Sequence, residues 1–311
     1  MSAIPRSVAL MVVNYFSSAQ VEDLLASIAA HTSHPERLIV SVVDNSDCSD
    51  EFDKLCAAVE LRREVFGSVL VTAAPSNLGY GKGNNLALGQ AAAAGPVDVA
   101  IVINPDVSVI SGDLYADACT ITSGVAYSAS TIGYDVALAG VATINALTSK
   151  SRQLRVGEDW SRLALTYPAG HFLAMTASMW ESSGGFDPEY FLYGEELDLI
   201  LRLRLSPTQI QPLPSVKVLH ASGGTTGSSH GAKTSVTYRH ATRSMVLLYR
   251  KHRRLRWWIP TMLIARVALA FGALGRGRIA EARAVAGGIY QGLTHPLSHP
   301  PTRADDAGTS Q

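Results

Sequence analysis

Cysteine is scarce in this chain, and its placement excludes the folds that depend on it. Three cysteines, Cys48, Cys56 and Cys119, occur in 311 residues, with no CxxC pair and no metal-finger spacing. An odd, widely spaced set forms no disulfide framework, which rules out the small disulfide-stabilised folds. Such a set is typical of a protein that stays in a reducing compartment.

An excess of charge of one sign is missing as well. The 26 basic and 26 acidic residues give a formal net charge of zero. A balanced chain does not attract a polyanion over long distances, so we expect no nucleic-acid partner. The exception is local, because residues 250–256 read RKHRRLR and the residues after them stay more basic than acidic.

Long uninterrupted apolar segments are also absent. The N-terminal run MSAIPRSVALMVV leads directly into polar Asn14 without a small-residue cleavage site, which is not the layout of a signal peptide. Residues 257–274 are apolar but contain Pro260 and Arg266, whereas a membrane-crossing helix uses roughly 20 uninterrupted apolar residues. We therefore expect a cytoplasmic protein.

The first hundred residues alternate between two patterns. Short β-branched runs alternate with helix-like stretches at residues 21–31 and 83–94, and the runs themselves occupy residues 8–13, 38–43, 69–73 and 99–103. Apolar strands separated by helices predict an α/β fold with a mainly parallel sheet and helices on both faces. Farther along, residues 136–144 and 166–180 also read as strands, and the polar stretch 148–160 between them reads as a loop. A chain of this length accommodates one main domain with an appendage.

Polar or small residues follow all four predicted strands. They are Asn14-Tyr15, Asp44-Asn45-Ser46, the glycine-rich stretch SNLGYGKGNN (76–85) and Asn104-Pro105-Asp106. Turn chemistry alone explains any one of them. Four together predict a ligand site, because ligands of such sheets bind at the carboxyl ends of the strands.

Asp106 is the most informative of these residues. A carboxylate at the end of a buried strand is well placed to hold a divalent cation such as Mg²⁺, which prefers oxygen ligands and substrate phosphates; an ordinary Asn-Pro-Asp turn is the alternative. The glycine-rich stretch is a weaker signal, because it matches neither a P-loop nor GxGxxG. Its glycines still permit close backbone approach, and Lys82 adds a positive charge.

The stretch YFLYGEELDL (190–199) places three carboxyl groups beside aromatic side chains. Glu195 and Glu196 favour a helix start, and Asp198 is spaced for an i,i+4 ion pair with Arg202. A carboxyl group beside an apolar wall also acquires a raised pKa, which suits a general base. We expect Asp198 to be structural and leave both roles open for the glutamates.

Seven motifs in this order resemble the inverting family 2 glycosyltransferases with a GT-A fold. They are VVNYF, VDNS, NLGYGKGNN, NPD, GHFLAM, GGFDPEYFLYGEELDL and VLHASGGT, and they cover roughly residues 7–225. Within the family, the chain is most similar to bacterial rhamnosyltransferases of cell-surface polysaccharide assembly.

The resemblance implies a role for each matching residue. Asp106 would bind the metal, Mg²⁺ or Mn²⁺, with His220 near the metal or the diphosphate, and Glu196 would be the base, with Glu195 as its possible substitute. Asp44 would lie near the nucleotide base, and Gly170 and His171 would border donor sugar and acceptor. The remaining nucleotide-sugar contacts would be Val13, Asn14, Tyr15, Asn45, Asn77, Gly79, Tyr80, Lys82, Gly83, Asn84 and Asn104.

Two positions depart from the family pattern. Glu195-Glu196 stands where the family usually has Glu-Asp, so the expected base is one methylene longer. Asn104 occupies the first position of the metal-binding DxD-like motif, as in the rhamnosyltransferase-like branch. The first departure keeps open a non-catalytic scaffold that binds a nucleotide sugar.

The predicted organisation has three parts. Residues 1–225 form the catalytic domain, with a nucleotide-sugar half (1–110) and an acceptor half (111–225), and 222–235 form a loop over the site. Residues 226–293 are helical, and their basic residues followed by paired tryptophans favour contact with the inner leaflet of the membrane; a core helix or dimer contact is the alternative. Residues 294–311 form a disordered tail.

The expected reaction is a single inverting displacement. It transfers L-rhamnose from dTDP-rhamnose to a lipid-linked or cell-surface polysaccharide acceptor, and a UDP-hexose donor is the alternative within the class. The motifs fix neither acceptor, linkage nor oligomeric state.

Overall fold

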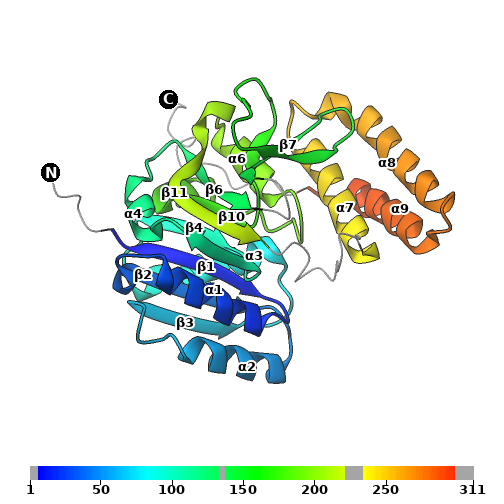
Figure 1. The fold of residues 1–311 in the computed structure, drawn as a ribbon. Helices are drawn as coiled ribbons and strands as arrows, with labels where there is room; N and C mark the ends of the chain where they lie inside the picture. Colours follow the sequence, from blue (N-terminus) through cyan, green and yellow to red (C-terminus); the bar gives the residue numbers. More distant parts are fainter. Residues whose placement is uncertain (1–5, 133–136, 221–233, 298–311) are drawn as a thin grey trace, which may run out of the picture.

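The structure is a computed structural model that describes residues 6–132, 137–220 and 234–297. Within these ranges the chain builds one 11-stranded sheet, whose main path has the order β3-β2-β1-β4-β10-β6-β11-β5. Helices cover both faces, and three further helices stand beside the sheet (Figure 1). The predicted α/β fold is confirmed.

The N-terminal half of the sheet is parallel. β1 (Val8–Asn14) pairs with β2 (Leu38–Asp44) and β4 (Val99–Ile103), and β3 (Ser68–Ala73) pairs with β2. These bounds agree with the four predicted strands to within one residue at each end. Parallel pairing in register brings the carboxyl ends of the strands to one edge.

Alternating side chains of β1 build two cores, one on each face of the sheet. Val8, Leu10 and Val12 pack on one face with α1 (Ser18–Ala30), α2 (Ser49–Glu60) and α4 (Leu114–Thr120). Ala9 and Met11 pack on the other face with α3 (Tyr80–Ala94), α5 (Ala177–Ser183) and α6 (Glu195–Leu203). Each core removes a large apolar area from water, which is the main stabilising contribution to folding.

The second half of the sheet mixes directions. β10 (Phe172–Thr176) runs antiparallel to β4 and β6 (Ala126–Ile132), while β11 (Ile210–His220) is parallel to β6 and antiparallel to β5 (Val107–Ser111). β7 (Ala137–Ile144), predicted as a strand, pairs with β8 (Ser151–Arg155) and β9 (Thr166–Pro168). Short 3₁₀ turns within the described residues include Pro35–Arg37, Pro207–Gln209 and Arg256–Trp258.

Two sequence predictions in this half were wrong. Residues 166–180 were expected to be one strand, but they form β9, β10 and the start of α5, because Thr176 accepts a hydrogen bond from the Met179 amide and caps the helix. The polar stretch 148–160 was expected to be a loop, yet it contains β8. Four of the five β8 side chains are exposed, so a strand here needs no apolar residues.

Three helices follow the sheet: α7 (Ser235–Lys251), α8 (Ile259–Leu274) and α9 (Ile279–Thr294), drawn yellow to red in Figure 1. A Cβ on Gly292 would lie 2.6 Å from Val246 Cβ, and one on Gly288 would lie 2.5 Å from Arg239 O. The missing side chains therefore allow α9 to approach α7 closely.

A third core joins α7 to the sheet domain. Leu197 and Leu201 of α6 pack with Tyr190 and with Met245 and Leu248 of α7. The C-terminal helices are thus anchored on the segment that carries the acidic cluster.

The predicted boundary between the catalytic domain and the helical region, at residue 225, stays a prediction. The predicted loop lies outside the described residues apart from Thr234 and Ser235, and so does the tail from residue 298.

Candidate active site

The ends of β1 and β2 carry a buried hydrogen-bonded cluster. Asn14 Nδ2 donates to Asp44 Oδ1 over 2.8 Å and to Glu51 Oε1 over 3.3 Å. Ser46 Oγ donates to the same Asp44 oxygen over 2.7 Å. Asn14 is completely buried and its Oδ1 accepts from Ser17, so its amide positions Asp44 rather than facing solvent. Tyr15, the next residue, is 40% exposed.

The glycine-rich stretch opens α3, as predicted, and is held from three sides. Asn77 Oδ1 accepts from the Gly79 amide, Asn45 Nδ2 donates to Gly79 O over 2.9 Å, and the Tyr80 amide donates to Phe191 O over 2.9 Å. Gly79 has φ +78°, and a Cβ there would lie 2.4 Å from Phe191 O. The loop therefore requires glycine both for its backbone angle and for its contact with the acidic segment.

Three other predicted residues lie in the first turn of α3. A Cβ on Gly83 would lie 2.8 Å from Val13 Cγ2, so this glycine lets the helix pack on β1. Lys82 is exposed, whereas Asn84 is buried and donates to Tyr80 O. The buried Oδ1 atoms of Asn84 and Asn45 have no hydrogen-bond partner within the described ranges.

Asp106 and two histidines form the second group. His220 Nε2, at the end of β11, lies 3.3 Å from Asp106 Oδ1. The His171 and His220 rings stack with centroids 4.4 Å apart, and His171 Nε2 is 2.7 Å from Thr131 Oγ1. Burial, and secondarily His220, lowers the pKa of His171 to about 3, so this ring is neutral at physiological pH.

A divalent metal fits this second group as a partly protein-held ion. Asp106 Oδ1 is buried and has no hydrogen-bond partner among the described side chains. In the part of the chain that the structure describes, no three His, Cys, Asp or Glu side chains converge on one point. Asp106 and His220 would therefore supply two ligands, and phosphate oxygens and water would supply the rest, which is the usual way Mg²⁺ is bound.

Glu196 and Glu195 begin α6, and both are buried. Glu196 is 8% exposed and Glu195 is fully buried. Burial raises the pKa of Glu196 to about 7. Burial and the adjacent Glu196 raise the pKa of Glu195 well above its ordinary value, and neither of its carboxyl oxygens has a partner among the described residues. Burial therefore favours the protonated form of both carboxyl groups, and the adjacent Glu196 favours it further at Glu195.

Gly170 makes room for the Glu196 carboxyl group. A Cβ at position 170 would lie 1.9 Å from Glu196 Oε1, and the Gly170 carbonyl accepts a hydrogen bond from the Tyr80 hydroxyl. Glu196 thus fulfils both predictions, because it lies in the first turn of α6 and its carboxyl group faces a pocket.

A cavity of about 910 Å³ lies beside these carboxyl groups. It is lined by strand ends, by the start of α6, by the β7–β8 connection and by α7 and α8. The predicted site residues that line it are Tyr80, Asn104, Gly170, His171, Glu195, Glu196 and His220. The other predicted residues, apart from Asp106, lie at the ends of β1 and β2 and around the start of α3. The predicted residues thus form two groups, one at these strand ends and one that lines the cavity.

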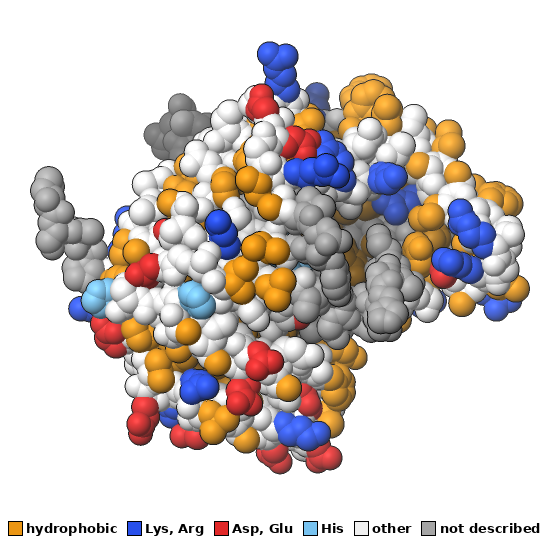
Figure 2. Space-filling model, in the orientation of Figure 1, with side chains coloured by type: hydrophobic (Ala, Val, Ile, Leu, Met, Phe, Trp, Pro, Cys, Tyr) orange, Lys and Arg blue, Asp and Glu red, His pale blue; other side chains and the backbone are white. Residues whose placement is uncertain are grey.

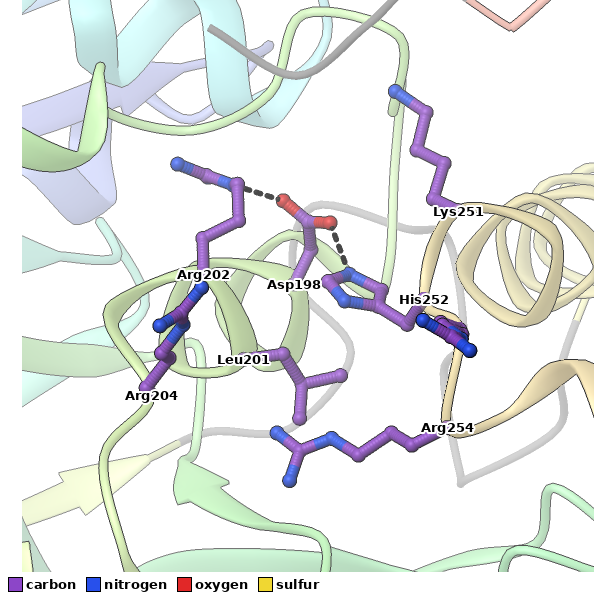
Figure 3. Close-up of a pocket in the computed structure, with 8 residues that line it drawn as sticks. Asp198, Leu201, Arg202, Arg204, Lys251, His252 and Arg254 are labelled. Carbon is purple, nitrogen blue, oxygen red and sulfur yellow. Dashed lines mark hydrogen bonds and ion pairs between the residues drawn. The ribbon is translucent and has the colours of Figure 1, made fainter. Parts of the chain in front are cut away.

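Asp198 lies behind the cavity, as predicted for a structural residue. Its carboxylate accepts from Arg202 Nε and lies 2.7 Å from His252 Nε2, which joins α6 to the segment after α7 (Figure 3). Burial tends to raise the pKa of Asp198, but the His252 hydrogen bond and the Arg202 charge outweigh it and hold that pKa below its usual range. The residues around it line a smaller cavity of about 590 Å³.

Sequence reasoning missed several residues of the larger cavity. Lys150 and Arg152 come from the β7–β8 connection and Arg266 comes from α8. Arg266 had been noted only as a break in an apolar run, although a single charge in such a run is itself a signal of a buried polar contact.

The family assignment follows from the match over most of the chain. The sequence model described as "Glycosyltransferase like family 2" matches residues 5–258. The chain belongs to this family. It is a glycosyltransferase, and the cavity and strand-end group described above are its candidate active site.

The glycosyltransferase is similar to a named enzyme of Mycobacterium tuberculosis, N-acetylglucosaminyl-diphospho-decaprenol L-rhamnosyltransferase. The two are 25% identical over 278 residues, which is 80% of this chain and 85% of the relative. Among solved structures, the mannosyltransferase PcManGT from Pyrobaculum calidifontis, in complex with GDP-Man and Mn²⁺, has a TM-score of 0.56 at 14% identity over 94% of this chain and 88% of that one.

A second solved structure has the same fold. TarS 1-349 of S. aureus, in complex with UDP-GlcNAc, has a TM-score of 0.53 at 17% identity and covers 84% of this glycosyltransferase and 73% of its own chain. These two structures confirm the GT-A fold that the sequence motifs implied.

Proposed function

We propose that this glycosyltransferase transfers L-rhamnose from dTDP-rhamnose to a lipid-linked acceptor by one inverting displacement. The observation that carries the proposal is Glu196, a buried carboxyl group with a pKa of about 7 that lines a cavity large enough for an acceptor. A general base works best when its pKa lies near the working pH.

The displacement makes one bond and breaks one bond. Glu196 takes the proton of an acceptor hydroxyl as that oxygen bonds to the anomeric carbon from the face opposite the diphosphate. The bond from this carbon to the diphosphate oxygen breaks in the same step, and the nucleoside diphosphate leaves with the electron pair. The configuration at the anomeric carbon is inverted because there is no covalent intermediate.

The leaving diphosphate gains negative charge, which Asp106 and His220 would stabilise indirectly by holding Mg²⁺ or Mn²⁺. A bound divalent ion supplies Lewis-acid stabilisation of such charge. Two solved structures of similar fold are complexes with Mn²⁺, the mannosyltransferase described above and GalNAc-T7 with UDP and GalNAc. The buried Asp106 Oδ1, which accepts no hydrogen bond within the described residues and lies 3.3 Å from His220 Nε2, supports the same assignment in this chain.

The donor and acceptor rest on the resemblance to the mycobacterial enzyme, whose name specifies rhamnose and a decaprenyl diphosphate. A UDP-hexose donor is the second candidate, since the TarS structure holds UDP-GlcNAc. A thermal-shift screen of dTDP-, UDP- and GDP-sugars with and without Mn²⁺ separates the donors, because stabilisation grows with affinity. We expect the largest shift with dTDP-rhamnose and Mn²⁺; a larger shift with a UDP-sugar would favour the second candidate.

The proposed function requires catalytic turnover as well as binding of the donor. Turnover is measured directly as release of dTDP from dTDP-rhamnose in the presence of a prenyl-diphosphate-linked N-acetylglucosamine. Binding of the donor without any turnover would identify the non-catalytic scaffold instead.

We further propose that the glycosyltransferase sits on the cytoplasmic face of the membrane through α8. Over the described ranges, one helix is long and apolar enough to cross a membrane by length and composition: Arg256–Leu274, with mean hydropathy 1.5 and 11% of its span buried. Its exposed apolar residues include Trp257, Ile264 and Phe271. Apolar and basic side chains gather together over α8 and α9, whereas acidic side chains of this face gather over α2 (Figure 2).

Arg266 and Pro260 favour a helix that lies on the surface over one that crosses the bilayer. A buried arginine that faces the protein leaves the opposite side of α8 apolar, which is the pattern of an interfacial helix. Basic residues beside paired tryptophans favour an anionic leaflet.

A further inference from the structure

The cavity beside Glu196 is lined by charges of both signs. Glu195 and Glu196 are the carboxyl groups among the described residues that line it. Lys150 and Arg152 of the β7–β8 connection and Arg266 of α8 line the same cavity. Arg152 already pairs with Glu158 over 2.5 Å, whereas no carboxylate within the described ranges pairs with Arg266 or Lys150.

Arg266 is the only charged residue of α8, and it is largely withdrawn from solvent. Its Nη2 atom donates to Ser149 Oγ over 2.6 Å and to Ser149 O over 3.2 Å. Its Nε atom is buried and has no hydrogen-bond partner in the described chain. Burial lowers the pKa of Arg266, which is the physical sign of a charge that lacks an anionic partner.

A purely structural role accounts for only part of this arrangement. The bonds to Ser149 tie α8 to the β7–β8 connection, and one Nη atom suffices for them. A neutral hydrogen-bonding Gln would provide the same tie without placing a charge there. A partly buried charge is costly unless it is paired, so a charge that lines a cavity calls for an anion within that cavity.

The opposite side of α8 indicates what the anion is attached to. Ala265, Arg266 and Leu269 line the cavity, while Ile264, Val267 and Phe271 are exposed at helical spacing. One helix thus presents a cation to the cavity and an apolar stripe to the outside. A ligand that matches both has an anionic head and a long apolar tail.

We propose that Arg266, assisted by Lys150, binds the diphosphate of a prenyl-diphosphate-linked acceptor, and that the prenyl chain leaves along the apolar stripe of α8. This proposal rests on the proposed function and specifies where its acceptor binds. The acceptor's sugar would then extend from the diphosphate toward Glu196, which lines the same cavity. Arg266 is a binding residue in this assignment and takes no part in the bond changes.

The test measures binding and needs no turnover, so it is independent of whether the donor has been identified correctly. Farnesyl diphosphate, farnesol and dTDP are titrated by calorimetry into the full-length protein and into Arg266→Met and Lys150→Met. Farnesyl diphosphate is measured without added metal. Arg276→Met is the matched control, because Arg276 is an exposed arginine just after α8 that does not line the cavity.

We expect Arg266→Met to weaken farnesyl diphosphate binding about tenfold to a hundredfold, as for loss of a charge-assisted hydrogen bond, and Lys150→Met to weaken it less. Farnesol should bind the wild type more weakly than farnesyl diphosphate, and dTDP affinity should be the same in all four proteins. If Arg266→Met unfolds, which its melting curve reveals, Lys150→Met carries the test.

Three results would overturn the proposal. The first is wild-type affinity for farnesyl diphosphate in both cavity variants. The second is equal affinity of the wild type for farnesol and farnesyl diphosphate. The third is an equal loss of dTDP affinity in Arg266→Met, which would assign the cation to the donor's diphosphate. Failure of every nucleotide sugar to turn over would instead count against the proposed function alone.

Discussion

Glu196 and Glu195 are neighbours in sequence with different surroundings. Both line the cavity, but Glu196 is 8% exposed and has a pKa of about 7, whereas Glu195 is fully buried and its pKa is raised well above its ordinary value by burial and by Glu196. The base must be ionised to accept a proton, so kcat should rise with pH through about 7 and level off above it. A pH profile that falls over this range would contradict the assignment of Glu196 as base.

Amide substitutions separate the two glutamates. Glu196→Gln should lower kcat by about a hundredfold or more, because the proton acceptor is lost while dTDP binding is kept. Glu195→Gln should change kcat by less than about threefold, because an amide is close in shape and charge to the protonated carboxyl group it replaces. Steady-state kinetics with saturating donor checks both, and a larger loss in Glu195→Gln would transfer the role to that residue.

Gly170 provides a steric test of the same carboxyl group. Gly170→Ala would place a Cβ 1.9 Å from Glu196 Oε1, so Glu196 must move and kcat should fall about tenfold or more. Gly89→Ala is the matched control, since Gly89 lies on α3 with nothing within 4 Å of a new Cβ. The control should keep full activity and gain about 0.5–1 kcal/mol of stability, as measured by urea unfolding. Equal activity in the two variants would mean that the Glu196 position is not critical.

At the scale of elements, α6 depends on the buried Asp198 carboxylate. Asp198→Asn leaves Arg202 buried without its counter-charge, and the free energy of unfolding at pH 7 should fall by about 3 kcal/mol. The folded-state pKa of Asp198 lies below its unfolded value, so this stabilisation is present above the unfolded pKa and is lost as pH falls through the folded one. Urea unfolding at pH 7 and pH 3 measures both effects.

Glu60→Gln is the control for Asp198→Asn. Glu60 pairs with Arg63, but both side chains are largely exposed, and exposed pairs contribute little. Similar losses in the two variants at pH 7 would show that burial of the Asp198 pair has no special importance.

The sequence predicted well the strands whose side chains are nearly all buried. β1, β2 and β4 are buried on both faces and read as apolar runs. β8 could not be found in this way, because its side chains are exposed and polar. The inward side of α8 depends on the position of the β7–β8 connection, so the orientation of Arg266 was beyond local sequence patterns.

The candidate site divides in the same manner. The strand-end residues Asp44 and Asp106 were predictable, because parallel strands bring their ends together wherever the sheet forms. The burial that separates Glu195 from Glu196 depends on Gly170 and on α3, which are distant in sequence. Sequence alone therefore located the acidic pair but could not assign the proton.

At the scale of the whole molecule, membrane contact should depend on the exposed apolar stripe. The triple variant Trp257→Ser, Ile264→Ser, Phe271→Ser should bind vesicles with anionic lipid more weakly by about a thousandfold or more, since burial of each of the three large apolar side chains contributes about 1.5–3 kcal/mol. Vesicle sedimentation measures the change. Leu61→Ser, at an equally exposed position next to α2, is the control. Unchanged binding of the triple variant would exclude α8 as the contact.

The close approach of α9 to α7 has an evolutionary consequence. Gly288 and Gly292 make α7 and α9 one interlocked unit, and that unit, with α8, supplies one wall of the cavity. The strand-end residues proposed to bind the nucleotide sugar, up to Asp106, are encoded more than 120 residues before residue 234, whereas Gly170, His171 and His220 lie closer in the chain. A lineage could therefore exchange residues 234–297 by recombination and acquire a new acceptor while inheriting its donor unchanged.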